Sequence, residues 1–308
     1  MESFLAAAIV AAMPLLYATI GEIITEKVGN LNLGVEGMML MGAVVGFIAG
    51  HTTGSPQIAV LAACAAGASG AAIFAVLTVS LRTNQVVTGL TLTIFGTGFA
   101  NLVGRSYVGV PLTPAVRDAF DSIAIPGLSQ IPVIGRALFD QDMLVYMGFI
   151  LVAATAFYYN KTRIGLNARA VGENAAAADA SGINISLYKY VNIIIGGALC
   201  GLGGAYMSLG TIPVWQENVV AGRGWIAVAL VIFASWKSIK GFLGALLFGA
   251  LSIIGFRLQA MGISVSQYLV DMIPYLATII IVIIGTHKNR KEDLPPGDLS
   301  NPYFREER

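Results

Sequence analysis

Neutral polar side chains gather at one end of an otherwise apolar stretch of the chain. They are Asn84, Gln85, Thr88 and Thr91, and the phenyl ring of Phe95 follows one helical turn later. Amides and hydroxyls hydrogen-bond uncharged solutes such as a ribose or a nucleobase, and an aromatic ring can stack on a base. Within a membrane the same groups also hydrogen-bond neighbouring helices. We take these five residues as candidates for lining a solute path.

Two acidic side chains and one further amide are candidates for the same path, because charged groups inside apolar stretches are costly and usually face a cavity or a partner. Asp271 lies between apolar runs, shortly before Pro274, and a position at a membrane interface fits it equally well. Asn32 and Glu36 stand at the start of another apolar run, in the segment NLNLGVEG. Stabilisation of the positive N-terminal end of a helix is by itself enough to explain an acidic residue at position 36.

The sequence lacks the residue patterns that would indicate an enzyme. The Lys-Thr pair at 161–162 and the Lys-Ser pair at 237–238 lack the preceding glycines of a phosphate-binding P-loop. His51 and His287 are too far apart in sequence, and in the topology derived below, to form a His-pair metal site. We therefore expect no catalytic residue, no metal site and no ATP site on this chain.

The composition indicates that the elements positioning these side chains are membrane helices. Hydrophobic residues make up 56% of the chain and charged residues 11%, whereas about 25% of the residues in a soluble domain are charged. Runs near the roughly 20 residues that cross the hydrocarbon fall at 3–24, 34–51, 57–81, 85–104, 142–160, 189–212, 224–236, 241–259 and 268–286. The sequence thus predicts an all-α polytopic membrane protein, a bundle of about nine transmembrane helices (eight to ten).

Two of these runs are open to another interpretation. The run 224–236 is short, and the run 85–104 is rich in Gly and Thr, so either can be tilted or partly re-entrant. The N-terminal MESFLAAAIV lacks a basic region and a cleavage site, so we interpret it as the start of a retained span.

Residues 161–188 form a polar island between two apolar runs, which must lie outside the bilayer because hydrocarbon cannot satisfy exposed backbone. Asn174 is suited to cap a short helix over AAAADAS, and Gly182 is suited to end it as the C′ residue. An ordinary interfacial helix is the plainer interpretation. A short helix with an alanine surface also suits close docking into a cleft on a cytosolic partner.

The distribution of basic residues orients the chain. The island carries several of them, so the positive-inside rule places it in the cytoplasm, with the N-terminus outside and the C-terminus inside. The outer side then keeps Arg105, Arg117, Arg136, Arg223 and Arg257.

The expected organisation is a transmembrane domain at 1–286, followed by a cytoplasmic tail at 287–308. The outer loop 105–141 contains prolines that favour turns and short surface helices. This loop can receive a solute-delivering binding protein or serve as a passive connector. The tail is charged and rich in proline, and it is expected to be a solvated extension with little fixed structure.

Small residues recur at four-residue intervals within two of the spans, at Gly42, Gly46 and Gly50 and again at Gly197, Gly201 and Ala205. Such a face lets helix backbones approach closely, which predicts a tight bundle. Cys64 and Cys200 both sit in apolar runs and are interpreted as small core residues.

Two blocks of the sequence resemble a known family. The segment ARAVGENAAAADASGINISLYKY resembles the cytoplasmic coupling segment of ABC importer permeases of the sugar, nucleoside and branched-chain amino acid group. The earlier segment GEIITEKVGNLNLGVEGMMLMGA is similar to the nucleoside-type permeases within that group. The two blocks occur in the expected order.

The resemblance implies a location and partners. It implies a multi-pass protein of the bacterial inner membrane, paired with a second and longer permease as a heterodimer. It implies a cytosolic ABC ATPase that holds ATP and Mg, so that this chain binds no cofactor, and an extracytoplasmic binding protein; no nucleic acid is expected. The residues that would couple to the ATPase are Gly172, Glu173, Asn174, Ala177, Ala178, Asp179, Gly182 and Ile183.

The function implied is the permease subunit of an ATP-driven nucleoside importer. The spans lack the concentrated Lys and Arg that a phosphorylated solute requires, and branched-chain amino acids usually need paired charges. A ribose-like sugar is the nearest alternative cargo. An ion-coupled secondary transporter is a further alternative, although such carriers are expected to show more buried acids and an internal repeat.

Overall fold

Apolar helices long enough to cross a membrane dominate the computed structural model, which describes every residue except 1, 133–134, 261–265, 267–271, 274, 281–282, 284–293 and 306–308. Among the described residues seven helices meet this criterion of length and composition. They are α1 (Glu2–Glu26), α2 (Val35–Thr53), α3 (Pro56–Ala75, extended by the π-turn η1, Val76–Ser80), α4 (Gln85–Gly104, extended by η2, Arg105–Tyr107), α7 (Met143–Lys161), α10 (Ile185–Tyr206, extended by η4, Met207–Thr211) and α12 (Ser238–Ala260).

The predicted all-α bundle is confirmed, and among the described residues one predicted span is replaced by a shorter helix. The run 224–236 forms α11 (Arg223–Ala234), a helix of 12 residues that is about 18 Å long and reaches only about halfway across the hydrocarbon. The run 85–104 is the full-length helix α4 and is not re-entrant. The ninth predicted span, 268–286, lies largely outside the described residues.

Capping side chains set several helix starts. Asn84, Asp142 and Asn184 each accept a hydrogen bond from a backbone N–H two or three residues later, at the first turns of α4, α7 and α10. Because of its cap, α10 begins four residues before the predicted run 189–212, which hydropathy alone could not show.

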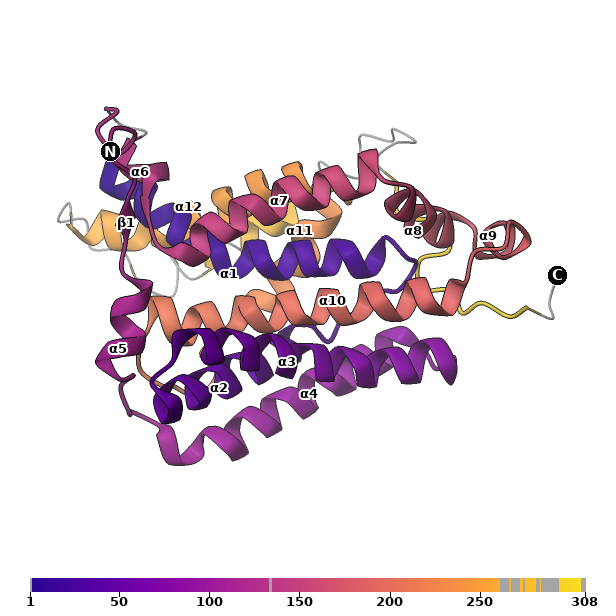
Figure 1. Cartoon of the computed structure of the whole chain (residues 1–308), viewed down its shortest axis with the longest axis horizontal. Coiled ribbons are helices and arrows are strands. Elements are labelled where there is room, and N and C mark those ends of the chain that lie inside the picture. Colours follow the sequence, from indigo (N-terminus) through magenta and orange to yellow (C-terminus); the bar gives the residue numbers. More distant parts are fainter. Residues whose placement is uncertain are drawn as a thin grey trace.

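Helix α10 runs through the centre of the bundle, between α1 on one side and α2 and α3 on the other (Figure 1). The predicted glycine faces meet there: a Cβ on Gly42 would come within 2.2 Å of the Gly201 carbonyl oxygen, and one on Gly67 would come within 2.2 Å of the Gly197 carbonyl oxygen. Only glycine permits this backbone approach, so the prediction of tight packing is confirmed. Cys200 is buried in the same region, and both cysteines are free.

The two ends of the bundle differ. The N-terminus lies at one end with the loop 105–141, whereas α8 (Arg163–Glu173), α9 (Ala175–Ala180) and the last described residues lie at the other end, here called the coupling end (Figure 1).

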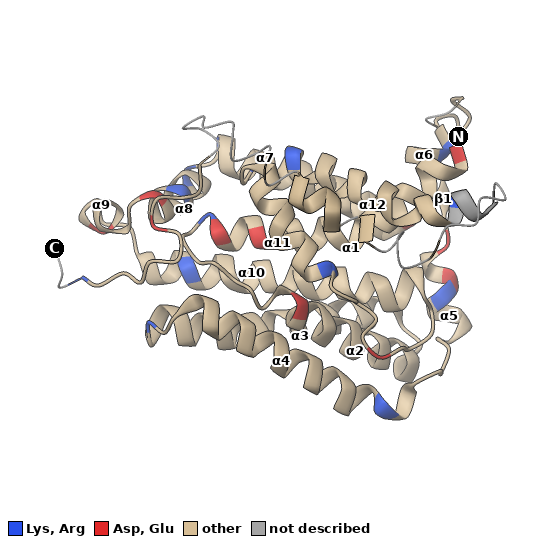
Figure 2. Ribbon diagram, turned by 180° about the vertical axis from the view of Figure 1, so that it is seen from behind, with Lys and Arg blue, Asp and Glu red and all other residues tan. Residues whose placement is uncertain are grey.

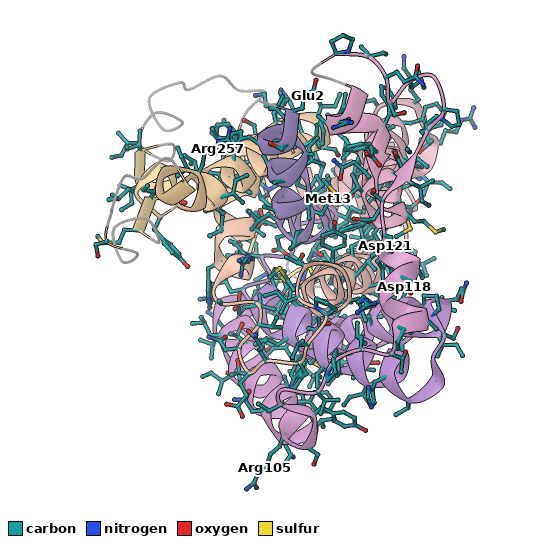
Figure 3. The ribbon with its side chains drawn as sticks, turned by 90° about the vertical axis from the view of Figure 1, so that its left-hand side faces the viewer. Glu2, Met13, Arg105, Asp118, Asp121 and Arg257 are labelled. Carbon is teal, nitrogen blue, oxygen red and sulfur yellow. The ribbon has the colours of Figure 1, made fainter. Side chains whose placement is uncertain are left out.

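The loop 105–141 folds into the predicted turns and short surface elements. They are α5 (Pro114–Arg117), η3 (Asp118–Phe120), β1 (Ile123–Ala124), α6 (Gly135–Phe139) and β2 (Asp140–Gln141), with β1 antiparallel to β2. Figure 3 looks onto this end, where Glu2, Arg105, Asp118 and Arg257 lie around the rim of the bundle.

The structure corrects the predicted place of Arg223 on the outer side of the membrane. Arg223 is the first residue of α11, about 18 Å along that helix from Ala234 at the coupling end, and its guanidinium donates to the Val220 carbonyl at 3.0 Å. Because α11 is a half-length helix, Arg223 lies within the bundle. Figure 2 shows most of the other basic residues toward the two ends of the bundle.

Candidate functional site

The short coupling helix forms by the local interactions that the sequence predicts. The Asn174 side chain accepts from the Ala177 N–H at 2.8 Å, and α9 then runs over six residues. Gly182 has φ of +80°, its N–H donates to the Asp179 carbonyl, and the Ile183 N–H donates to the Ala178 carbonyl. These two bonds make a Schellman motif, the usual glycine-dependent way of ending a helix.

The helix presents a small, exposed surface at the coupling end. Ala177 is exposed, together with Glu173 and Asn174, whereas Ala178 is buried against the rest of the segment. A Cβ on Gly172 would come within 2.2 Å of the Lys27 carbonyl oxygen, so the preceding helix α8 packs directly on the connection between α1 and α2. The predicted coupling residues therefore divide into an outward set and a set that anchors the segment to the bundle.

Residues 294–305 of the tail are bound to this segment, which corrects the expectation of little fixed structure. The Asp298 carboxylate accepts from the Ala175 N–H at 2.6 Å, and the Asp298 N–H donates to the Gly172 carbonyl at 2.9 Å. The Tyr303 hydroxyl donates to Asp179, and Arg305 pairs with the same carboxylate at 3.1 Å. We call residues 294–305 the strap; its partners lie over 100 residues away in sequence, which is why composition alone did not reveal it.

The connection between α1 and α2 turns inward, and buried polar side chains form hydrogen bonds with its backbone N–H and carbonyl groups. The Leu31 N–H donates to Gln85 at 2.7 Å and the Asn32 N–H donates to Glu22 at 2.9 Å. The Thr93 hydroxyl donates to the Leu33 carbonyl at 2.9 Å. Irregular backbone at membrane depth is tolerated only where protein or water satisfies it, and these side chains meet that need.

Glu36 joins the starts of two helices inside the bundle. One carboxylate oxygen accepts from the Gly222 N–H at 2.8 Å and the other from the Gly224 N–H at 2.7 Å. A Cβ on Gly224 would come within 2.6 Å of the Glu36 backbone, so the first turns of α2 and α11 are in contact. The negative charge lies at two positive helix ends, which is a stabilising arrangement.

An open groove of about 470 Å³ lies between α3 and α4 on the outside of the bundle. It is lined by four of the predicted path residues, Asn84, Thr88, Thr91 and Phe95, together with apolar side chains from α3. Phe95 is half exposed and stacks on Phe99 with ring centroids 6.3 Å apart. This groove is the place where the structure brings the neutral polar residues and an aromatic surface together.

The remaining path candidates lie elsewhere. Asn32 and Gln85 are buried in the network around the inward-turning connection, and both carboxylate oxygens of Glu36 accept backbone N–H groups. Asp271 lies outside the described residues. Glu22 and Glu26 were not among the predicted site residues, although two acids near the end of an apolar run are visible in the sequence. Both take part in buried hydrogen bonds: Glu22 accepts from the Asn32 N–H, and Glu26 accepts from the Trp236 indole N–H at 2.5 Å.

These features define a polytopic membrane protein in which interrupted helices meet inside the bundle, an arrangement typical of transporters. The chain matches, over residues 4–283, the family described as "Branched-chain amino acid transport system / permease component", and it belongs to that family.

Curated relatives cover nearly the full length of the chain. The putative glucose ABC transporter permease TsgC13 of Haloferax volcanii is 34% identical, over 97% of both chains. The guanosine permease NupQ of Bacillus subtilis is 34% identical over 89% of both chains, and the nucleoside permease NupC of Lactococcus lactis subsp. cremoris is 34% identical over 88% of both. No solved structure matches the chain.

Two of these organisms have a second permease that is named for the same solute. TsgB13 of Haloferax volcanii is 27% identical and NupP of Bacillus subtilis is 24% identical to the chain. The match covers 74% of TsgB13 and 76% of NupP, so both are longer proteins than the chain.

Proposed function

We propose that this chain is the permease subunit of an ATP-driven importer that carries nucleosides across the bacterial inner membrane. A separate cytosolic ATPase supplies the energy, and an external binding protein delivers the solute to the loop 105–141. The observation that carries this proposal is the exposed, locally capped α9 at the end of a bundle whose family and relatives are transport permeases.

The outward face of α4 supports a second membrane subunit beside it. Thr91, Phe95, Gly98 and Asn101 all lie exposed on this helix, and a Cβ on Gly98 would meet nothing within 4 Å. The Thr91 hydroxyl donates to the Val87 carbonyl of its own helix, whereas an exposed amide such as that of Asn101 is costly against lipid. We infer that α4 faces a solute path shared with a second permease.

Other outward faces have a different chemistry. The exposed residues of α7 are Met143, Ile150, Ala153, Ala154 and Phe157 within its apolar part, and those of α12 include Ile239, Leu243 and Leu247. These faces suit lipid. The outward face of α4 also exposes Val87, Ile94 and Leu102, and it differs from the faces of α7 and α12 by the exposed Thr91 and Asn101 among these apolar side chains.

We favour a heterodimer with a longer permease. The support is that the paired permeases of two organisms differ in length and that the shorter member of each pair matches the chain with the higher identity. In this assembly the coupling end faces the cytoplasm, with the N-terminus outside, as the basic residues of the sequence predict.

A nucleoside is the favoured cargo because the α3–α4 groove combines hydroxyls and an amide with the ring of Phe95, which stacks on Phe99 beside the groove. Two relatives are named as guanosine and nucleoside permeases. A simple sugar is the second candidate, favoured by the near full-length match to a putative glucose permease.

Competition for radiolabelled uptake tests the cargo. Cells that express the chain with its neighbouring gene products are given labelled guanosine, with excess unlabelled uridine, adenosine, ribose or glucose. Inhibition by nucleosides alone supports the proposal. Absence of guanosine uptake, together with uptake of labelled glucose that excess ribose or glucose inhibits, would assign the permease to sugars.

A further inference from the structure

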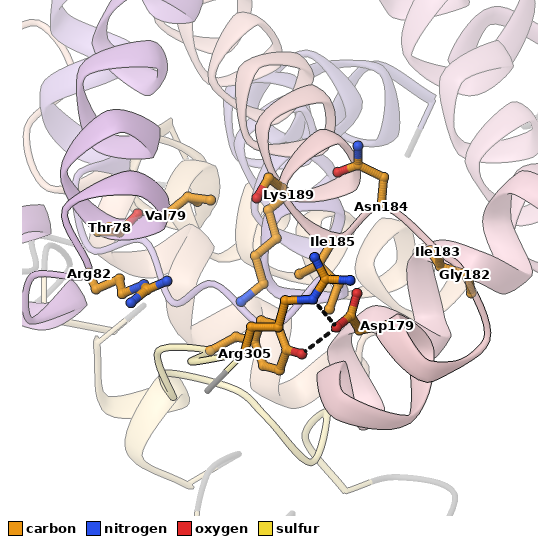
Figure 4. Close-up of a pocket in the computed structure, with 12 residues that line it drawn as sticks. Thr78, Val79, Arg82, Asp179, Gly182, Ile183, Asn184, Ile185, Lys189 and Arg305 are labelled. Atoms are coloured by element: carbon orange, nitrogen blue, oxygen red, sulfur yellow. Dashed lines mark hydrogen bonds and ion pairs between the residues drawn. The ribbon is translucent and has the colours of Figure 1, made fainter. Parts of the chain in front are cut away.

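A pocket of about 430 Å³ opens at the coupling end, between the end of α3, the start of α10, the coupling helix and the strap. Arg82, Lys189 and Arg305 all line it, as does Asp179 (Figure 4). In the close-up, the Lys189 side chain extends into the pocket between Arg82 on one side and Arg305 on the other.

Lys189 is buried, and no acceptor is directly bound to its ammonium among the described residues. Its side chain belongs to a residue that is 4% exposed, and its ammonium makes no hydrogen bond or ion pair with any residue that the structure describes. The ammonium lines the pocket with no directly bound acceptor, and a largely desolvated cation in such a place is stabilised by an anion beside it. The position therefore calls for an anion in the pocket.

The acidic groups nearby do not bind the Lys189 ammonium directly. The Asp179 carboxylate accepts from Tyr303 and pairs with Arg305 at 3.1 Å. Asp298 acts on Lys189 only through space, because its carboxylate is bound to the Ala175 N–H. Arg82 lies over the Phe304 ring, 4.7 Å from its centroid, which leaves the guanidinium donors available.

The start of α10 adds donors to the same space. Ile185 and Ser186 line the pocket, and they are the first two residues of a helix of 22 residues. The first N–H groups of a helix have no partner within the helix, and the helix end carries partial positive charge. The Asn184 side chain caps only the Leu187 N–H.

We propose that this pocket binds a phosphate group, held by Lys189, Arg82 and the first N–H groups of α10. Several cationic donors converging with a helix N-terminus match the many acceptor oxygens of a phosphate better than a single carboxylate. The group can belong to an anionic phospholipid or to a soluble phosphate compound. Leu81 and Leu187 lie exposed beside the pocket, where acyl chains of a lipid would pack.

An occupant would connect the coupling helix to the bundle. Asp179, Gly182 and Ile183 come from the coupling segment, whereas Lys189 and Arg82 come from the ends of membrane helices. A phosphate held between them would fix the position of α9 relative to α3 and α10.

Direct binding to the detergent-purified full-length chain tests the proposal. One arm counts phosphatidylglycerol retained in native mass spectrometry, with phosphatidylcholine as the comparison lipid. The other arm measures thermal stabilisation by inorganic phosphate and by adenosine monophosphate. Retention of phosphatidylglycerol alone identifies a lipid source, and stabilisation by the soluble compounds identifies a soluble one.

The variants decide whether the binding occurs in this pocket. Lys189→Gln and Arg82→Gln are each expected to weaken binding about tenfold, and Lys189→Arg to keep it within about twofold. Lys161→Gln, which changes an exposed lysine outside the pocket, is the matched control and is expected to bind normally. Arg82 is exposed, so its variant stays informative if Lys189→Gln fails to fold.

Two results would overturn the proposal: no binding of any of these probes, or binding that Lys161→Gln weakens as much as Lys189→Gln and Arg82→Gln do. Because no transport is measured, these results would leave the proposed import function untouched.

Discussion

Glu36 connects residues that are far apart in sequence and close in the bundle. Its two oxygens hold the N–H groups of Gly222 and Gly224, which begin α11. Both bonds come from donors at a helix start that have no partner within their own helix. The acid therefore has a structural role that is sufficient to explain its burial, whatever further role it has in transport.

Replacing Glu36 with Gln should destabilise the fold. The amide nitrogen of Gln is a donor, so one of the two backbone N–H groups would be left facing another donor. We expect a loss of about 1–3 kcal/mol in the free energy of unfolding, measured by detergent-induced unfolding followed by circular dichroism. Glu217→Gln, at an exposed position, is the control. Equal stability of the two variants would show that the bonds to α11 contribute nothing.

Lys27, in the connection after α1, should titrate near neutral pH. Burial lowers its pKa to about 8, and the neighbouring charges of Arg169 and Lys237 act in the same direction, against Glu173. The folded protein then binds fewer protons than the unfolded chain between about pH 8 and pH 10.5, so this residue makes stability rise with pH across that interval.

Acylation of the neutral amine measures this pKa. The rate of Lys27 modification, followed by mass spectrometry, should reach half its maximum near pH 8, and Arg169→Gln should move that midpoint upward. A midpoint near the ordinary lysine value of about 10.4 in the unmodified protein would contradict the assignment.

Among the elements, local structure was predictable and long-range contact was not. Asn174 and Gly182 act on backbone groups within a few residues, so the sequence predicts α9 with its cap and its end. The strap depends on bonds such as that from Ala175 to Asp298, 123 residues apart. A charged, proline-bearing tail has no periodicity that reveals such a partner.

Ala177→Arg should uncouple transport from ATP hydrolysis while leaving the fold intact. Ala177 is exposed on α9, so a bulky cation there obstructs docking without disturbing the bundle. Ala178 is 3% exposed, so Arg at that position would test packing instead. We expect solute-stimulated ATP hydrolysis and uptake to fall at least about tenfold, as for loss of a central interface contact.

The control for this prediction is Asn160→Arg, which places the same charge at the exposed end of α7. It should retain uptake and hydrolysis. Normal activity of Ala177→Arg, with the protein present in the membrane, would show that α9 does not carry the coupling.

For the whole molecule, hydropathy predicted the bundle and marked 224–236 as a short run, but it did not predict how the half-length helix is held. A span needs only a long apolar run, and seven of the nine predicted runs are membrane-length helices among the described residues. The half-length α11 is apolar after Arg223, so the composition of these residues does not separate it from a short or tilted span. What fixes its start is the contact of Gly222 and Gly224 with Glu36, which no local pattern predicts.

The outward face of α4 should lie against a second permease. A photo-crosslinking benzoyl-phenylalanine placed at Phe95, which is 50% exposed, is expected to capture another membrane subunit. The same group at Ile150 on the apolar face of α7, which is 68% exposed, should capture none. The captured protein is identified by mass spectrometry. Equal capture at both positions, or capture at Ile150 alone, would place the partner elsewhere.

ATP-dependent accumulation of labelled guanosine in vesicles tests the central claim most directly. The vesicles contain the chain, its second permease and the ATPase, and the binding protein is supplied on the side opposite the ATPase. The account predicts accumulation that requires ATP on the ATPase side and disappears when this chain is omitted. Accumulation driven by an ion gradient without ATP, or by vesicles holding this chain alone, would contradict it.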